Sequence, residues 1–340
     1  MPRSDVVVEG RKTIRDVAAR AGVSPGSVSK ALNGTGQLRA ETRSRIIADA
    51  QELNFQLGAH PRGTAASPKR SYTVGLITTD SFARFSVPIL LGVEDALGAG
   101  QISVFLCDSR DDPIRERHYV ETLQRRRVDG FIVTGRSSNR RSPLPVDPSF
   151  PVVYALSPSS DPRDCSVVVD DVAIGRIAGE HFIRMGRTKV AHVTGPERFD
   201  AARERAEGLA AALTTGGLEL VDQVYYGNWS EAWGRQATQM VLRANPDVDA
   251  IYCGSDLIAR GVGDALRDLG KDVPSDVALI GTDNWNPIAV GARPALTTID
   301  PDLHHIGRIA ADCLLDAIDG RPHSGVMRIA GQLVVRGSTN

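Results

Sequence analysis

Two hydrophobic patterns divide the chain. In residues 13–53 the apolar side chains recur every three or four positions, which is the period of amphipathic helices. From Thr73 onward, short continuous apolar runs alternate with longer amphipathic stretches, which predicts parallel sheets covered by helices on both faces. The runs are TVGLIT, ISVFLC, GFIVTG, VVYAL, KVAHVTG, DAIYCG and VALIGTD. The sequence therefore predicts an all-α head and an α/β body of two doubly wound parallel-sheet lobes.

The first pattern predicts three short helices. Thr13 caps the first helix and Gly22 ends it, because glycine supplies the backbone freedom of a tight turn. Ser24 and Pro25 begin the second, and the third covers about Ala40 to Leu53. The residues expected in their common core are Ile14, Val17, Ala18, Val28, Leu32, Ile46, Ile47, Ala50 and Leu53. A helix, a glycine-containing turn and a second helix form the helix-turn-helix pattern.

The stretch QLGAHPRGTAASPKRS separates the head from the body. It is rich in Gly, Ala, Pro and Ser, a composition that is typical of linkers. We therefore expect a helix-turn-helix domain over 1–56, a hinge or linker over 57–72, and the two-lobed body over 73–340.

Charge is distributed unevenly between these parts. Residues 1–70 hold 12 Lys and Arg against 6 Asp and Glu, whereas the remainder holds 28 against 35. The net charge of −1 for the 340 residues thus conceals a basic head on an acidic body. A basic head indicates a polyanionic partner for the head alone.

Other function classes lack their sequence signals. No apolar run is long enough to span a bilayer, and the N-terminus shows no secretory segment. Four scattered cysteines without a CxxC pair favour unpaired thiols in a reducing cytoplasm. GxSxG, P-loop and HExxH motifs are absent, so we predict neither an enzyme nor a cofactor or metal site.

The residues resemble a known family along nearly the whole chain. TIRDVAARAGVSPGSVSKALNG followed by ETRSRIIADAQELNF is similar to the DNA-binding head of LacI/GalR-type transcriptional regulators. The similarity continues through RRRVDGFIVTG, SVVVDDVAIGRIAGEHFIRMG, GSDLIARGVGDALRDLG, VPSDVALIGTDN and LVVRGST. It implies a homodimer that binds a near-palindromic operator with one head per half-site.

The same resemblance implies that the body is an effector-binding and dimerisation domain, shaped like a periplasmic sugar-binding protein. The chain should cross between the lobes three times. We expect lobe one at about 73–160 and 300–324, and lobe two at about 161–299 and 325–340. The sequence ends after LVVRGST without the heptad tail of some relatives, so we expect a dimer rather than a tetramer.

The resemblance places the second helix of the head in the major groove of DNA. Its candidate contacts are Ser24, Pro25, Gly26, Ser27, Ser29, Lys30 and Asn33, with Thr13, Ile14 and Arg15 near the DNA backbone. Pro25 and Gly26 stand at the two positions that discriminate half-sites in the family, which predicts weaker direct readout there. Lys30 replaces the Arg of many relatives and reaches guanine as a point charge. For the serines, an ordinary place on the helix surface is the alternative.

The linker departs from the family pattern. Relatives form a hinge helix that places a Leu in the minor groove, and here that Leu aligns with Thr64, close to Arg62. Pro61 and Gly63 disfavour a helix interior by about 3 and 1 kcal/mol. We expect Arg62 and Thr64 at the DNA, and a smaller operator kink or a differently ordered hinge. Whether residues 57–72 form a helix stays open.

Family ligand contacts match five positions of the body: Arg205, Asp283, Trp229, Ser255 and Asp256, with Arg203, Phe85, Asp80 and Trp285 as further candidates. Arginine and aspartate can bond hydroxyl groups, and an aromatic ring can stack on a sugar face, so a sugar is the expected effector.

Structural alternatives compete with these assignments. Asp256 could cap the following helix, Trp229 could be plain packing, and Arg205 could form a surface ion pair. Leu156 and Pro301 replace polar residues of relatives, so a nucleobase or another metabolite stays open as the ligand.

The sequence therefore predicts a cytoplasmic DNA-binding regulator, a repressor, whose operator affinity is controlled by a metabolite bound between two lobes. The alternative is a sugar-binding transport-type protein without DNA function, against which the basic head argues. Effector identity, operator sequence, and the choice between induction and corepression stay open.

Overall fold

The computed structural model describes residues 13–32, 38–53, 72–98 and 102–340. Contacts divide the chain into two units, one up to Pro68 and one from Lys69 onward, and we describe each separately. The predicted DNA contacts Asn33, Arg62 and Thr64 lie outside the described residues, as do Pro61 and Gly63 of the predicted hinge.

The head consists of α1 (Ile14–Ala21), α2 (Pro25–Leu32) and α3 (Ala40–Glu52). Thr13 forms a capping box with Asp16, in which each side chain bonds the backbone N–H of the other residue. Gly22 ends α1 at φ 64°, a left-handed conformation that glycine adopts without steric cost. Capping and turn chemistry therefore fix the first helix where the sequence predicts it.

A small core joins the three helices. Its buried members are Val17, Ala18, Ala21, Val28, Ala31, Ile46 and Ala50, with Ile14, Leu32 and Leu53 packed at its edge. The prediction that Ile47 joins this core was wrong, because it is 38% exposed. Ile46 already fills the inward position of α3, and the next residue points about 100° further around the helix.

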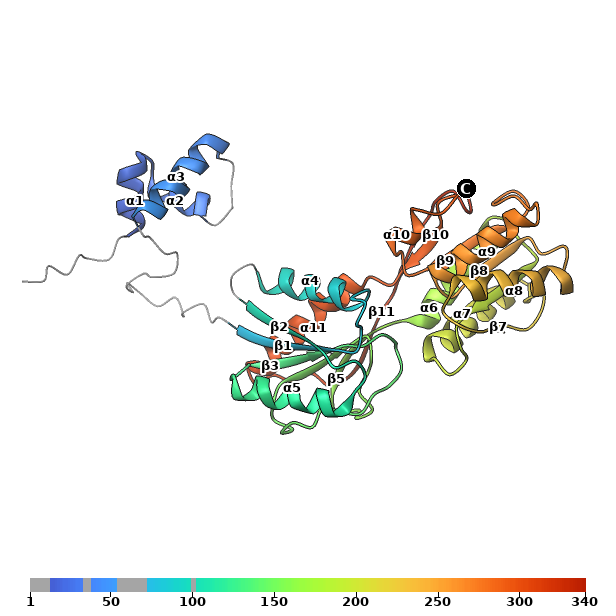
Figure 1. Cartoon of the computed structure of the whole chain (residues 1–340), viewed down its shortest axis with the longest axis horizontal. Coiled ribbons are helices and arrows are strands. Elements are labelled where there is room, and N and C mark those ends of the chain that lie inside the picture. Colours follow the sequence, from blue (N-terminus) through green and yellow to red (C-terminus); the bar gives the residue numbers. More distant parts are fainter. Residues whose placement is uncertain (1–12, 33–37, 54–71, 99–101) are drawn as a thin grey trace, which may run out of the picture. The chain divides into compact units, whose positions relative to one another are not determined.

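The body contains two six-stranded sheets, which define lobe one and lobe two (Figure 1). Lobe one has the strand order β11-β5-β4-β3-β1-β2, with all neighbours parallel. Its elements are β1 (Tyr72–Thr78), α4 (Ser86–Leu97), β2 (Ile102–Asp108), α5 (Pro113–Arg125), β3 (Gly130–Val133), β4 (Val152–Ala155), β5 (Cys165–Val169), α11 (Leu303–Ile318) and β11 (Gly325–Ile329).

Lobe two has the order β12-β10-β9-β8-β6-β7, and only β12 runs antiparallel to its neighbour. Its elements are α6 (Asp171–Arg184), β6 (Val190–Thr194), α7 (Asp200–Thr215), β7 (Tyr225–Tyr226), α8 (Glu231–Ala244), β8 (Ala250–Cys253), α9 (Asp256–Asp268), β9 (Ala278–Thr282), α10 (Asn286–Ala289), β10 (Thr297–Asp300) and β12 (Gln332–Val334). Both sheets are doubly wound, as the strand pattern predicts.

The lobe limits differ from the sequence prediction in two strands. β5 pairs with β4, and β11 pairs with β5, so both strands belong to lobe one. The chain therefore changes lobe after Val169, after Asp300 and between Ile329 and Gln332. The assignment of 161–169 and 325–329 to lobe two was wrong, because an apolar strand has the same composition in either sheet.

Helices α6 and α7 approach each other at two glycines. A Cβ at Gly175 would lie 1.9 Å from the carbonyl oxygen of Arg205, and one at Gly208 would lie 1.9 Å from that of Val172. Only glycine permits this contact, which fixes the position of Arg205 relative to α6. None of the helices in the described part of the chain is long and apolar enough to cross a membrane.

Candidate functional site

A cavity of about 290 Å³ lies between the lobes, where the carboxyl ends of their strands meet. Lobe one contributes Thr79, Asp80, Ser81, Phe82, Arg84, Phe85, Arg136, Ser137, Ser138, Leu156 and Val169. Lobe two contributes Asp171, Phe199, Ala201, Arg205, Trp229, Gly254, Ser255 and Asp283. Six of the nine predicted effector residues line this cavity: Asp80, Phe85, Arg205, Trp229, Ser255 and Asp283.

Arg205 is held rigidly beneath the cavity. Its Nε donates to Asp171 Oδ1 at 2.7 Å, and its Nη1 donates to the carbonyl oxygen of Gly254 at 2.6 Å. Burial lowers the pKa of the guanidinium, but the charge of Asp171, its hydrogen bond and the acidic neighbours Tyr252 and Asp283 together outweigh burial and raise that pKa. Arg205 is therefore a buried, permanently charged donor, and not the surface ion pair that was its structural alternative.

Asp283 connects the two lobes. Its carboxylate forms an ion pair with Arg84, which precedes α4 in lobe one, and the two side chains are only 10% and 16% exposed. The Arg84 guanidinium also lies over the rings of Phe85 and Trp285, at 5.0 and 4.7 Å from their centroids. Burial raises the pKa of Asp283, whereas Arg84 and Arg205 oppose that shift.

Two cavity residues carry backbone strain. Asp283 has φ 108° and Leu156 has φ 72°, and each directly follows a strand at its carboxyl end. Such conformations persist only where surrounding structure enforces them, and they cluster at functional sites.

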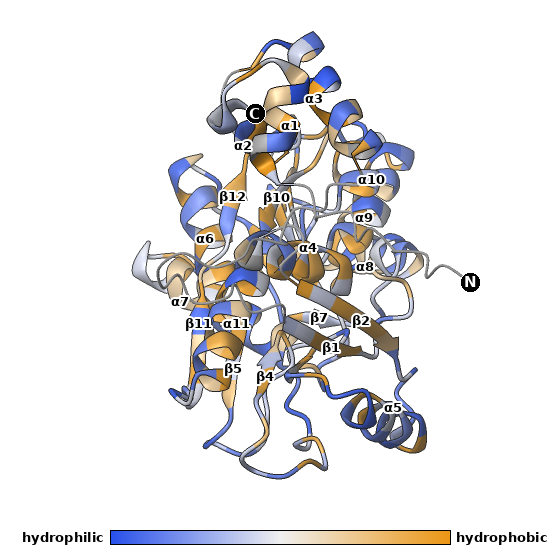
Figure 2. Cartoon of the chain, turned by 90° about the vertical axis from the view of Figure 1, so that its left-hand side faces the viewer, coloured by the Kyte–Doolittle hydropathy of each residue, from blue (hydrophilic) through white to orange (hydrophobic). Residues whose placement is uncertain are grey.

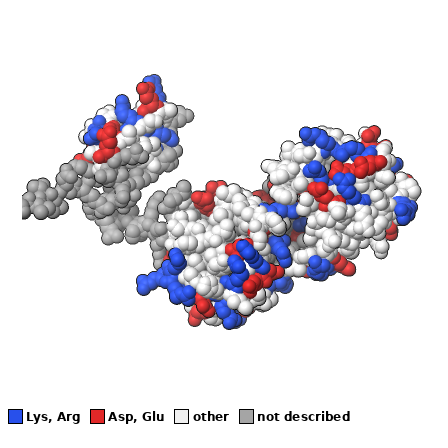
Figure 3. Space-filling view, viewed as in Figure 1, with Lys and Arg blue, Asp and Glu red and all other residues white. Residues whose placement is uncertain are grey.

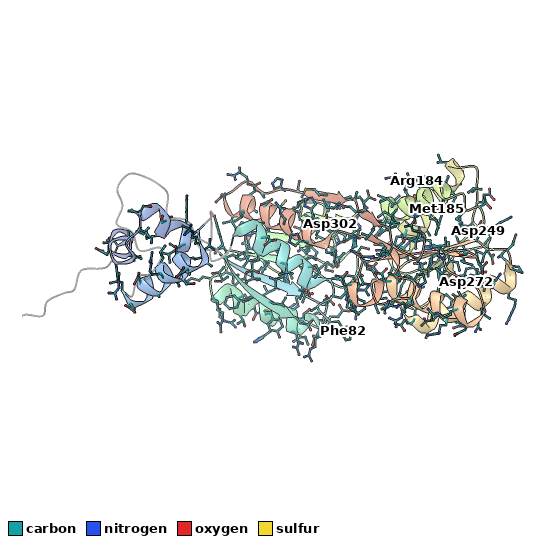
Figure 4. The ribbon with its side chains drawn as sticks, turned by 90° about the horizontal axis from the view of Figure 1, so that it is seen from above. Phe82, Arg184, Met185, Asp249, Asp272 and Asp302 are labelled. Atoms are coloured by element: carbon teal, nitrogen blue, oxygen red, sulfur yellow. The ribbon has the colours of Figure 1, made fainter. Side chains whose placement is uncertain are left out.

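Aromatic rings form one wall of the cavity. The Trp229 ring lies against the backbone of Gly195, where an added Cβ would come within 2.1 Å of it. Phe199 meets Trp229 edge-on with centroids 6.0 Å apart. Phe82, labelled in Figure 4, projects from the surface of lobe one at the rim and is 94% exposed. This wall offers flat apolar surfaces to a ring-shaped ligand.

Two lining residues also support the helices beside the cavity. Asp80 accepts hydrogen bonds from the backbone N–H of Phe85 at 2.7 Å and of Ser86 at 2.9 Å, at the start of α4. Ser255 caps α9 by accepting from the N–H of Ile258. Both side chains therefore fix the loops that carry the other cavity residues.

Three predicted residues do not line the cavity. Asp256 is fully buried and accepts from Thr298 Oγ1 at 2.6 Å and from the N–H of Trp285 at 2.8 Å, so it joins α9 to its neighbours. Arg203 bonds the carbonyl of Glu197 and the Asp200 carboxylate on the surface of α7. Trp285 lies under Arg84, beside the cavity.

Four residues that line the cavity were not predicted from the sequence: Arg84, Asp171, Phe199 and Arg136. Asp171 was detectable, because it lies two residues after the apolar run Val167–Val169, at the strand end where ligands bind in this architecture. Arg84 carried no comparable signal, since it lies in a loop and acquires its role only through Asp283, 199 residues later in the chain.

On the head, α2 presents most of the predicted base-reading residues. Ser24, Pro25, Gly26 and Lys30 are exposed, whereas Ser27 and Ser29 are half-buried. The Ser24 and Ser27 hydroxyls lie 3.0 Å apart, and Ser24 accepts from the Ser27 N–H. Among the predicted backbone contacts, Thr13 serves in the capping box, Ile14 packs at the core edge, and Arg15 lies in α1.

A buried histidine lies in the sheet of lobe two. His192 stacks on Tyr252 with centroids 4.7 Å apart, and its Nδ1 lies 3.0 Å from the carbonyl oxygen of that residue. Burial lowers the pKa of His192 to about 4. The unfolded chain therefore binds a proton at higher pH than the folded chain, and stability is lost as pH falls below the unfolded pKa of about 6.5.

We expect His192→Asn, which keeps a donor at the Nδ1 position, to remove this pH dependence. Wild type should lose about 2 kcal/mol more unfolding free energy than the variant between pH 7 and pH 5. Urea denaturation at both pH values measures the difference. Burial raises the pKa of Asp256 and of Asp283, which opposes the effect of His192 on acidification, but these contributions are the same in both proteins and cancel. Equal pH dependence in the two proteins would show that His192 is not the titrating group.

A helix-turn-helix head and a two-lobed body with a cavity at its strand ends define a ligand-responsive DNA-binding regulator. The family described as "Bacterial regulatory proteins, lacI family" matches residues 13–56, and "Periplasmic binding protein-like domain" matches residues 180–339. The regulator CelR of Thermobifida fusca is 32% identical over 321 residues, covering 91% of this chain and 93% of its own. The chain belongs to the LacI family of transcriptional regulators.

Two further comparisons agree. The ribose operon repressor of Halalkalibacterium halodurans is 29% identical over 334 residues, which cover 96% of this chain and 97% of the repressor. The solved complex of CelR with cellobiose is 30% identical, with a TM-score of 0.67, and covers 96% of this chain and 100% of its own. The similarity to these regulators of transcription thus extends over almost the whole of each chain.

Proposed function

We propose that this chain represses transcription as a homodimer on a near-palindromic operator, and that a neutral sugar bound between the lobes controls its operator affinity. The observation that carries the proposal is that Arg205, Asp283 and the Trp229 ring line one cavity between the lobes, in a chain that also has a helix-turn-helix head. The effector changes the inter-lobe arrangement by binding one arrangement more tightly.

The α2 helix supports the DNA part of the proposal. Pro25 and Gly26 at its start and Lys30 in its last turn are exposed and can enter the major groove, where Lys30 meets guanine acceptors and Pro25 offers only apolar contact. Gly26 offers no side chain, so discrimination at the facing base pairs rests on fewer contacts than a larger residue would give.

Exposed apolar residues of lobe one support dimerisation. Val87 and Leu91 on α4 and Phe105 and Leu106 on β2 are all exposed. Figure 2 shows much of α4 and β2 in the orange of hydrophobic residues, and Figure 3 shows a broad uncharged area on the upper part of lobe one beside a small acidic group. Sedimentation should give twice the chain mass of 36.4 kDa.

The charges of the cavity favour a neutral ligand. Arg205 is paired with Asp171 and Arg84 with Asp283, so an anion or a cation would have to break a buried ion pair. Sugar hydroxyls donate to carboxylates and accept from guanidinium groups, and their ring faces stack on Trp229. The relatives CelR, in complex with cellobiose, and a ribose operon repressor carry sugar names.

Thermal-shift screening with neutral sugars and with purine bases tests the effector class. We expect a sugar to raise the melting temperature, since a ligand at 100 times its Kd adds about 2.7 kcal/mol of stability. The same sugar should change operator affinity in a gel-shift titration, and Asp283→Asn should abolish both effects. A response to purine bases with none to sugars would favour a nucleobase effector.

The Arg84–Asp283 pair makes a separate prediction about pH. Arg84→Met removes a cation that opposes the raised pKa of Asp283, so that pKa should rise further and Asp283 should be protonated more readily. Effector affinity should then fall on acidification by up to about tenfold per pH unit below the new pKa. Calorimetric titration between pH 8 and pH 6 measures the dependence.

Arg136→Met is the matched control for this variant. Arg136 lines the same cavity but pairs with the exposed Asp111 within lobe one. Its variant should keep the pH dependence of wild type, and an equal change in both variants would mean that general loss of positive charge is responsible.

A further inference from the structure

Three consecutive arginines lie at the edge of lobe one where its parallel strands begin. Arg125 is the last residue of α5, Arg126 follows as the C-cap, and Arg127 turns the chain at φ 58°. All three residues are exposed. We call them the arginine turn, which leads directly into β3.

The arginine turn lies beside the first residues of the body. The N–H of Thr73 donates to Asp129 Oδ2 at 2.8 Å, and the N–H of Asp129 donates to the carbonyl oxygen of Thr73 at 2.7 Å. Thr73 directly follows Tyr72, where β1 begins. Figure 3 shows Lys and Arg side chains projecting from the left-hand edge of lobe one, the edge at which β1 begins in Figure 1. Asp129 therefore fixes the arginine turn close to the point where the chain enters the body.

Most of the positive charge of the arginine turn is uncompensated. Among the described carboxylates only Glu121 pairs with Arg125, at 3.9 Å, and the two side chains are 65% and 56% exposed. Such an exposed pair contributes little. Arg126 lies over the Phe105 ring, 5.9 Å from its centroid, and neither Arg126 nor Arg127 forms an ion pair with a described carboxylate.

The other half of the same edge is neutralised. β5 and β11 begin there, at the opposite end of the sheet from β1 and β2. Arg163, just before β5, pairs with Asp161 at 2.6 Å, and Arg321, before β11, pairs with Asp316 at 2.6 Å. Uncompensated positive charge is therefore concentrated where β1 and β3 begin.

An exposed group of arginines suits an extended polyanion better than a small anion. None of the three arginines lines the inter-lobe cavity, and their exposure leaves a small anion without enclosing walls. The phosphates of duplex DNA are regularly spaced and are bound by Arg and Lys without a pocket. Residues 54–71 join the head to Tyr72 and can span up to about 70 Å. The chain thus allows this edge to meet the duplex that the head binds.

We propose that the arginine turn is a second DNA contact of the protein, which binds phosphates of the duplex beside the operator half-site. The head reads base sequence, and the arginine turn adds affinity that does not depend on sequence. The inference rests on the operator binding proposed above, and it gives the body a role besides effector binding and dimerisation. An operator with flanking duplex should therefore bind more tightly than a bare operator.

Operator duplexes of two lengths test the inference by fluorescence anisotropy with the full chain. One duplex holds only the sequence enriched from a random library, and the other carries about 15 further base pairs on each side, enough for a helical turn or more. We expect wild type to bind the longer duplex about tenfold more tightly at about 0.1 M salt. The triple variant Arg125→Gln, Arg126→Gln and Arg127→Gln should bind both lengths equally, with the wild-type affinity for the bare operator.

The salt dependence gives a second measure on the same duplexes. On the longer duplex, the slope of log affinity against log salt should fall by about 0.9 for each phosphate contact that the triple variant loses. On the bare operator the slopes of wild type and variant should agree. The melting temperature should not change, because the three side chains are exposed.

The matched control removes three positive charges elsewhere on the body: Arg163→Gln, Arg321→Gln and Arg243→Gln. The first two lie on the neutralised half of the edge, and Arg243 is exposed on α8 of lobe two. This variant should keep the preference of wild type for the longer duplex. A wild type without that preference, or equal losses in the two variants, would overturn the arginine turn as a DNA contact. Failure of wild type to bind either duplex would overturn operator binding itself.

Discussion

Replacing Arg205 with Met should abolish the effector response and lower the free energy of unfolding by about 3 kcal/mol. Arg205 is the only partner that the structure gives to the Asp171 carboxylate among the described side chains, and Asp171 is 1% exposed. Methionine keeps much of the volume but leaves that carboxylate buried and uncompensated. Urea denaturation measures the stability, and calorimetry should show effector affinity reduced by about 100-fold or more.

The double variant Arg205→Met with Asp171→Asn separates these two consequences. Removing the carboxylate removes the uncompensated charge, so most of the lost stability should return. Effector affinity should stay low, because the donor that faces the cavity is still missing. Recovery of effector binding along with stability would mean that Arg205 acts on the fold alone.

Replacing Val28 with Asp should eliminate operator binding while leaving the effector site intact. Val28 is fully buried in the small core of the head, and a core of this size has little stability to lose. Burying a carboxylate there costs more than about 3 kcal/mol, so α2 would no longer be presented as a helix. Fluorescence anisotropy on operator DNA should show affinity reduced by more than about 100-fold, with unchanged effector titration.

Ile47→Asp is the control for that experiment. Like Val28→Asp, this substitution replaces a branched apolar side chain with a negatively charged aspartate, but Ile47 is exposed on α3. Operator affinity should fall only modestly, through the added negative charge near DNA. Equal losses in the two variants would show that charge, and not the core of the head, determines the result.

Local chemistry made the head predictable. Thr13 and Gly22 mark the first helix because capping and left-handed turns depend on residues within a few positions of each other. The prediction for Ile47 was wrong because either of two adjacent isoleucines fits the helical spacing of apolar residues. Only the packing of the three helices places Ile46, and not Ile47, in the core.

The body was predictable as strands and helices but not in its division into lobes. β5 and β11 have ordinary apolar sequences, and their place in lobe one depends on pairing partners far away in the chain. Arg205, Trp229 and Asp283, which the family motifs suggested as effector contacts, line the cavity, and their binding of the effector stays a prediction. They could not reveal Arg84, because its contact with Asp283 arises only when both lobes are folded.

Selection from a random duplex library with the full chain shows whether the protein reads DNA sequence under the control of an effector. We expect enrichment of a near-palindromic sequence whose half-sites are about one helical turn apart, or a multiple of it. Adding the sugar identified by thermal shift should change the affinity for that sequence. If the protein retained no sequence above random duplex, both with and without the sugar, it would not be an effector-controlled DNA-binding regulator.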